Sequence, residues 1–238
     1  MQKVDRFNYS QFYIEDGYKE LLLPADKNGN YQIEKNALHI WPRGRFMLIA
    51  LPNEDGSFTC TLFMPYDNHE YAFNDLDSDE KINVFFKTIF PDFHALMPNL
   101  IENWHQNPLS SLSIVRCYPW TMGKFALMGD SCHATVPFYG QGMNAGFEDC
   151  TVMWELYNQH QNWDETFKAY QKTRKADGDA LQDLSLHNYY VMRDHVANDD
   201  FLLQKKIEAK LHEKYPEKWI PLYSQVTFSH IPYSKAIA

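Results

Sequence analysis

The most informative run of residues in this chain is GDSCHATVPFYGQGMNAGFED, at positions 129–149. It follows the apolar segment 125–128, which the pattern predicts to be a buried strand that runs straight into Asp130. Three closely spaced glycines in the run allow the backbone to approach a ligand. A helix is predicted from Met143, and its first N–H groups could bind an anion or a carbonyl. The run therefore predicts a ligand site made by a strand end, a loop and a helix start.

Other sequence motifs of catalysis or nucleotide binding do not occur in the chain. The glycines at 140, 142 and 146 miss the G-x-G-x-x-G fingerprint, because the third comes one residue late and the context is a long loop. The sequence has no phosphate-binding P-loop, no G-x-S-x-G motif and no histidine pair with zinc-ligand spacing. We therefore expect no metal site and no nucleophilic side chain.

Around this run, the first half of the chain is β-rich and the second half is helical. Strands are predicted over 18–23, 37–41, 45–51, 57–64, 113–118 and 124–128, and helices over 78–90, 92–106, 143–159, 164–195 (interrupted near 177–178), 201–214 and 220–230. Segments 45–51 and 57–64 predict an antiparallel hairpin. Phe58, Cys60 and Leu62 alternate along it with Thr59, Thr61 and Phe63. Strands followed by helices indicate an α+β fold, with one α/β-like junction at Asp130.

Composition and net charge limit the classes of protein to which this chain can belong. The chain has 238 residues, the length of one large domain or two small ones. Its residues are 45% hydrophobic and 16% aromatic, which is typical of a folded protein and not of a disordered chain. With 22 basic and 31 acidic residues, the formal net charge is −9. An acidic surface repels phosphate, so we expect no nucleic-acid binding and no charge-driven membrane binding.

The cellular environment is predicted from cysteines and apolar runs. Cys60, Cys117, Cys132 and Cys150 are widely spaced, and we expect free buried thiols in a reducing compartment. No apolar run approaches the ~18 residues that cross a bilayer. The first residues lack the apolar core of a signal peptide. The sequence as given therefore predicts a soluble, cytoplasmic protein without a membrane segment.

The run at 129–149 closely resembles the second flavin motif of the class A flavoprotein aromatic hydroxylases. Further segments are similar to this family in the same order and extend the resemblance over almost the entire chain. They are LHIWPR at 38–43, FMLIALP at 46–52, SFTCTLFMP at 57–65, DLS at 183–185 with Asn188 and Tyr189, IPLY at 220–223 and VTFS at 226–229.

The resemblance implies a p-hydroxybenzoate-hydroxylase-like architecture, a mixed α+β and α/β fold. Residues 1–120 would be part of a β-rich substrate domain, and 121–160 the last strand and helix of a Rossmann-like FAD domain. Residues 161–238 would form the C-terminal helices. The implied activity is the hydroxylation of a small aromatic amino acid with FAD, NADPH and O₂. Some relatives carry a membrane anchor further along, which would place them at the mitochondrial outer membrane.

The family also implies roles for individual residues. Asp130 would contact the ribityl chain of FAD, and the backbone at Gly142, Met143 and Asn144 would contact the isoalloxazine. The amino-acid end of the substrate would be held by Asn188 and Tyr223. Because the cofactor performs the chemistry, no side chain need be a catalytic nucleophile. The substrate ring would lie against Ile49, Leu51, Phe63, Pro137, Phe138 and Gln141.

The residue pattern supports only part of this assignment. Asn188 falls on an apolar helical stripe with Leu181, Leu184, Val191 and Met192, so its amide should be buried and hydrogen-bonded. A purely structural hydrogen bond would satisfy the same pattern. The strand positions assigned to the substrate ring, and the tyrosine at 223, are equally typical of a hydrophobic core.

Several family features are not found in this sequence. The glycine-rich turn for the FAD pyrophosphate, the acidic residue for the adenosine ribose, and the arginine and first tyrosine for the substrate are not found, nor is the middle Asp-Gly motif. We therefore expect the C-terminal portion of such an enzyme. Either the chain is a fragment or split gene product, or another chain supplies the missing N-terminal half. Two alternatives stay open: a flavin hydroxylase for another aromatic substrate, and a folded fragment without catalysis.

Overall fold

The computed structural model describes residues 3, 5–195 and 198–237, apart from the side chain of the residue at 195. The chain divides into two compact units. We call Ile14–Leu112 with Arg193–Ala197 the sheet unit, and Met1–Tyr13, Ser113–Met192 and Asn198–Ala238 the motif unit. The three functional segments expected above stay a prediction, because this division follows packing and not function.

The sheet unit is built on an antiparallel sheet. The strands are ordered β2-β3-β4-β1-β5, and β1 and β5 continue into the motif unit. β3 and β4 form the predicted hairpin, with Met47 opposite Phe63 and Pro52 opposite Phe58. The strand bounds are Asn8–Leu23 for β1, His39–Pro42 for β2, Met47–Pro52 for β3, Phe58–Pro65 for β4 and Leu109–Tyr118 for β5.

One face of this sheet carries the hydrophobic core of the sheet unit. Phe58, Cys60 and Leu62 are fully buried and cluster with Phe86 of α1 and with Phe90 between α1 and α2, which confirms the alternation predicted for β4. The single helix expected over 92–106 is wrong, because the chain forms two helices on either side of Pro98, whose ring disfavours continuation. The covering elements are η1 (Phe73–Asp75), α1 (Asp79–Ile89), α2 (Pro91–Leu96) and α3 (Leu100–Gln106).

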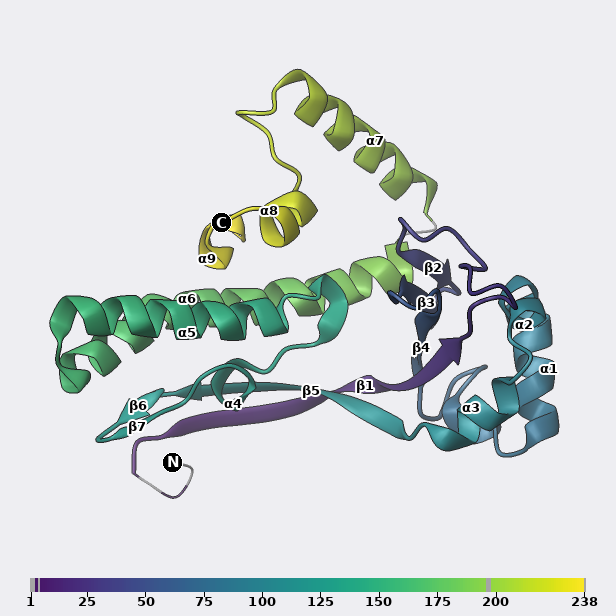
Figure 1. Cartoon of the computed structure of the whole chain (residues 1–238), viewed down its shortest axis with the longest axis horizontal. Coiled ribbons are helices and arrows are strands. Elements are labelled where there is room, and N and C mark those ends of the chain that lie inside the picture. The colour runs from purple at the N-terminus through teal and green to yellow at the C-terminus, as the bar shows by residue number, and fades with distance from the viewer. Residues whose placement is uncertain (1–2, 4, 196–197, 238) are drawn as a thin grey trace. The chain divides into compact units, whose positions relative to one another are not determined.

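The motif unit is dominated by two long neighbouring helices, α5 (Gly142–His160) and α6 (Trp163–Tyr190) (Figure 1). The turn between them uses Gln161 at a φ of +50° and the Asn162 side chain, which caps α6. The π-helical turn η3 (Val191–His195) follows α6. The remaining elements are β6 (Thr121–Met122), β7 (Phe125–Ala126), α4 (Asp130–His133), η2 (Pro137–Tyr139), α7 (Asp199–Lys214), α8 (Leu222–Phe228) and α9 (Tyr233–Ala236).

Two expectations for the motif unit are wrong. The buried strand over 124–128 is reduced to β7, which pairs with β6, and Phe125 is 71% exposed. A strand needs a paired neighbour, and the two residues of β6 are the only partner this segment has within the described sheets. The interruption of α6 near Gly178 is also wrong, because α6 continues through this glycine.

The continuity of α6 leads to a stability prediction. A Cβ atom on Gly178 would lie 2.9 Å from Cη2 of Trp120 and 3.2 Å from Cβ of His133, and the Trp120 side chain is fully buried. We expect Gly178→Ala to lower the free energy of unfolding by about 1–2 kcal/mol in urea, because overpacking outweighs the helix propensity of alanine. Gly146→Ala on α5 is the control, since its Cβ meets only an ordinary contact at 3.7 Å. Equal effects of both variants would contradict this reasoning.

All four cysteines are free thiols. Cys60, Cys117 and Cys132 are buried as expected, whereas Cys150 is exposed and is not among the buried positions of α5. Within residues 3, 5–195 and 198–237, no helix has both the length and the apolar character needed to cross a membrane.

Candidate functional site

The motif at 129–149 begins with a tightly fixed turn. Gly129 has a φ of +56° and a ψ of −140° and directly precedes α4. Its carbonyl accepts hydrogen bonds from the backbone N–H groups of Cys132 and His133, both at 3.0 Å. The Ser131 hydroxyl donates to the Met128 carbonyl at 2.7 Å and accepts from the Met128 amide. These bonds fix where the backbone places Asp130, the first residue of α4.

A hollow of about 560 Å³ opens between this turn and the start of α5. Three of the four residues predicted to bind the cofactor line it, namely Asp130, Gly142 and Met143. The fourth, Asn144, instead lines a neighbouring hollow and donates its side-chain amide to Oε1 of Gln141. The other residues lining the first hollow are Gly129, Thr135, Pro137, Gly140 and Gly146.

Glycines make the wall of this hollow from backbone. Gly129 lies so close to α5 that a Cβ on Gly146 would come within 3.7 Å of the Gly129 Cα. Gly140 adopts the left-handed conformation that ends η2, at a φ of +67°. No described side chain caps the first turn of α5. The N–H groups of this turn are therefore available to a ligand in the hollow.

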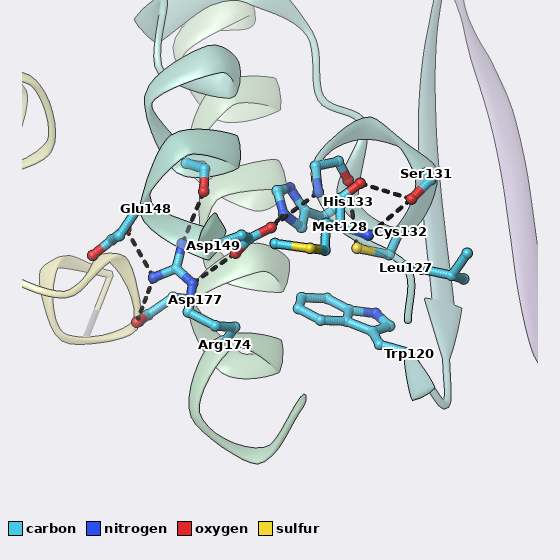
Figure 2. Close-up of polar contacts among 12 residues, drawn as sticks. Trp120, Leu127, Met128, Ser131, Cys132, His133, Glu148, Asp149, Arg174 and Asp177 are labelled. Atoms are coloured by element: carbon cyan, nitrogen blue, oxygen red, sulfur yellow. Dashed lines mark hydrogen bonds and ion pairs between the residues drawn. The ribbon is translucent and has the colours of Figure 1, made fainter. Parts of the chain in front are cut away.

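Behind the hollow lies a buried ionic network centred on Asp149 (Figure 2). One carboxylate oxygen of Asp149 accepts the Gly129 amide at 2.9 Å and lies 2.6 Å from Nε2 of His133. The other accepts Nε of Arg174 at 2.8 Å. Burial alone would raise the pKa of Asp149, but these hydrogen bonds outweigh it and lower the pKa to about 2. Asp149 is therefore ionised and holds the Gly129 turn against α5 and α6.

Arg174 extends this network towards the C-terminal end of the chain. Its Nη1 lies 2.8 Å from Glu148 and 3.8 Å from Asp177, and its Nη2 donates to the Ala145 carbonyl (Figure 2). Asp177 in turn accepts hydrogen bonds from the Ser234 amide and hydroxyl, at 3.0 and 2.6 Å. Sequence reasoning missed Asp149 and Arg174 as site residues. The sequence did offer a signal for them, because each is a charged residue on the apolar side of a long predicted helix, where an unpaired charge is rare.

Cys132, His133 and Asp149 also form a cluster whose potential ligand atoms lie within 4.8 Å of one another. The carboxylate is already engaged by Arg174 and by the Gly129 amide. Burial raises the pKa of the Cys132 thiol, so the thiolate that binds metals is disfavoured. The geometry thus favours an ion-pair network over a metal centre.

The predicted substrate residues of the motif unit gather around η2. The Asn188 amide is buried and donates to the Phe138 carbonyl at 2.7 Å. The ring of Tyr223 packs on that of Tyr139, with centroids 5.5 Å apart. Asn188 on α6 and Tyr223 on α8 therefore both contact this one turn. The remaining predicted residues of this unit, Pro137 and Gln141, belong to η2 and to the position before α5.

Ile49, Leu51 and Phe63 lie in the sheet unit, on the face of the sheet opposite the core formed with α1, α2 and α3. Ile49 and Leu51 are two positions apart on β3, so they point to the same side. Leu51 is 48% exposed, whereas Phe63 is buried and packs against Tyr18 of β1 at 6.2 Å. Ile49 and Leu51 thus offer accessible apolar surface.

The chain matches known sequences over its full length. Residues 104–185 match the family described as FAD binding domain. Kynurenine 3-monooxygenase of Flavobacterium psychrophilum is 53% identical over 100% of this chain and 54% of that protein. The kynurenine 3-monooxygenase of Dictyostelium discoideum is 46% identical over 99% of this chain and 54% of that protein. The chain thus spans about half the length of these curated relatives.

Solved structures share the fold at low sequence identity. A structure of 2-methyl-3-hydroxypyridine-5-carboxylic acid oxygenase has a TM-score of 0.64 at 19% identity and covers 83% of this chain and 53% of that one. Klebsiella pneumoniae HpxO in complex with FAD and uric acid has a TM-score of 0.59 at 18% identity and covers 87% and 51%. These likenesses confirm the expected fold of class A FAD-dependent hydroxylases. Over its whole length the chain is thus similar in sequence to kynurenine 3-monooxygenases, and it matches about half the length of each.

Proposed function

We propose that this chain is the C-terminal half of an FAD- and NADPH-dependent monooxygenase that converts L-kynurenine to 3-hydroxykynurenine. The observation that carries the proposal is the hollow between the Gly129 turn and the start of α5, which collects Asp130, Gly142 and Met143. Homology to kynurenine 3-monooxygenases over the full chain supports the choice of substrate.

The residues around the hollow fit a flavin. Their glycine backbone leaves room for a flat ring system, and the uncapped first turn of α5 supplies N–H donors. Asp130 would hold the ribityl chain, while the backbone at Gly142, Met143 and Asn144 would face the isoalloxazine. The positive end of α5 would stabilise negative charge on the reduced ring. When bound, FAD reduced by NADPH would activate O₂, one atom of which enters the aromatic ring while the other leaves as water.

The substrate would lie beside η2. Asn188 donates its amide to the Phe138 carbonyl at 2.7 Å and to the thioether sulfur of Met192 at 3.5 Å. A thioether is a weak acceptor, so the carboxylate of the substrate would replace it and bind this amide hydrogen together with the Tyr223 hydroxyl. Pro137, Phe138 and Gln141 would lie along the ring. Contact of the ring with Ile49, Leu51 and Phe63 of the sheet unit is proposed from the resemblance to the family alone.

The proposal includes a contact between this chain and the part of the curated relatives that it does not match. Met143, Phe147 and Trp154 follow one face of α5 at helical spacing and are 72%, 64% and 61% exposed. Such an apolar stripe is typical of a surface that another protein segment covers. The cytoplasm is the proposed compartment, supported by three buried free thiols.

FAD titration of the purified chain tests the proposal. We expect the flavin fluorescence to be quenched on binding, and binding to be tighter when the chain is mixed with the part of the Flavobacterium psychrophilum relative that it does not match. Asp130→Ala should weaken FAD binding about 10-fold or more, because a ligand hydrogen bond is lost. Asp164→Ala, an exposed first-turn acid of α6, is the matched control.

The mixed protein is then assayed for NADPH oxidation with L-kynurenine and with other aromatic acids. Formation of 3-hydroxykynurenine supports the proposal. Turnover of a different aromatic substrate alone would identify a related hydroxylase instead. If FAD binds neither the chain alone nor the mixture, the enzymatic function is refuted and the non-catalytic fragment is favoured.

A further inference from the structure

The short helix α9 makes hydrogen bonds to Gln141 and to Asp177, and these two residues connect it to the two walls of the flavin-site hollow. It packs on α6 and joins the apolar cluster of Tyr139, Leu184 and Val226 through Tyr233 and Ala236. Its first two residues also form hydrogen bonds that apolar packing does not require. The bonds from Tyr233 and from Ser234 lead to different parts of the motif at 129–149.

The first connection runs from Tyr233 to the start of α5. The Tyr233 hydroxyl donates to Oε1 of Gln141 at 3.4 Å. The same oxygen accepts from the Asn144 side chain at 3.1 Å, and Nε2 of Gln141 donates to the Tyr139 carbonyl at 3.2 Å. The Gln141 amide is buried and so has defined partners at both ends. Tyr233 thereby helps to fix the loop at Gln141, which directly precedes the first turn of α5.

The second connection runs from Ser234 to the Gly129 turn. Ser234 donates twice to Oδ1 of Asp177, whose other oxygen faces Arg174. Arg174 is bound to Asp149, and Asp149 holds the Gly129 amide. Figure 2 shows Arg174 between the carboxylates of Asp149, Glu148 and Asp177. The Gly129 turn and α9 are thus linked through residues of α5 and α6.

We propose that Tyr233 and Ser234 are positioning residues, and that the start of α9 acts as a clasp on the two backbone segments that face the flavin. The inference rests on the proposed function for its biological meaning, because it assigns these residues to the geometry of that site. The connections themselves exist in the chain without any ligand. Each can therefore be broken and measured in FAD-free protein.

Hydrogen–deuterium exchange of the FAD-free chain tests the clasp. Tyr233→Phe removes one hydroxyl and should speed exchange about 5-fold at the amides of 145–148, the first of which donates to the Gln141 carbonyl. Ser234→Ala should speed exchange about 2- to 5-fold at 129–133, where the chain of contacts is longer. Lys235→Ala, at an exposed position of the same helix, is the control and should change neither segment.

The pattern of exchange separates positioning from general stability. Two localised effects, each in its own segment, support the clasp. Unchanged exchange in both segments would overturn it, and so would an equal increase throughout α6 and α8, which is the signature of global destabilisation. FAD affinity is measured in parallel on the same variants and should fall several-fold. If the wild-type chain binds no FAD, the proposed function fails. The exchange data still test whether Tyr233 and Ser234 position the two segments.

Discussion

Replacement of Asp149 by alanine is expected to lower the free energy of unfolding by about 3–5 kcal/mol. The substitution leaves the buried Arg174 guanidinium without its fully buried carboxylate partner and leaves the Gly129 amide without an acceptor. Buried charges that lose one partner are strongly destabilising because they cannot be rehydrated. Urea unfolding followed by circular dichroism measures the effect.

Glu148→Gln is the matched control for this variant. Glu148 contacts the same guanidinium at 2.8 Å, but its side chain is 51% exposed, so its loss should cost less than about 1 kcal/mol. The contrast isolates burial as the cause. Similar losses in the two variants would show that the Asp149 network does not anchor the motif.

The pH dependence of Asp149 follows from its lowered pKa. The folded value of about 2 lies below the ordinary 3.8, so ionised Asp149 stabilises the protein above pH 3.8, and the stabilisation is lost as the pH falls towards 2. The difference in stability between wild type and Asp149→Asn should be constant from pH 7 to 5. It should shrink by about 1 kcal/mol by pH 3. A difference that grows on acidification would contradict the assignment.

The second large effect is expected at Gly129. Its φ of +56° and ψ of −140° fall in a region that essentially only glycine adopts. Its own Cβ would meet nothing nearer than 3.9 Å, so the cost of Gly129→Ala is backbone strain and not a clash. We expect a loss of about 2–3 kcal/mol in the free energy of unfolding. Because this turn precedes Asp130, FAD affinity should fall as well.

Gly140 offers a matched comparison within the same hollow. It also has a positive φ, with a ψ of 21°, but this left-handed conformation is open to asparagine. A Cβ at Gly140 meets nothing within 4 Å. Gly140→Asn should therefore be nearly neutral, whereas Gly129→Asn should be as harmful as Gly129→Ala. Thermal and urea unfolding of the three variants test the difference, and equal tolerance at both glycines would contradict it.

The sequence predicted those parts of the fold that depend on local patterns. The alternation of Phe58, Cys60 and Leu62 gave the buried face of β4 because successive side chains point to opposite sides of a strand. Glycines and turn residues located the start of α5 within one residue. The apolar stripe around Asn188 predicted the burial of its amide, and the structure supplies the partner, the Phe138 carbonyl.

The parts that failed depend on partners distant in sequence. Segment 124–128 is apolar enough for a strand, but pairing with β6 limits it to two residues. Gly178 was expected to interrupt a helix, yet Trp120 fills the space beside it and α6 continues. The local sequence pattern cannot predict either outcome, because both depend on which distant segment packs against these residues in the folded chain.

By itself, then, the sequence determined the motif at 129–149, the faces of the hairpin and the resemblance that directs attention to FAD. Only the tertiary structure decided that Asp149, Arg174 and Ser234 form one connected network behind that motif. The physical reason is the distance along the sequence between the residues that interact. Backbone conformation and side-chain alternation are set by near neighbours, whereas the pairing of buried charges requires helices that meet only after the chain has folded.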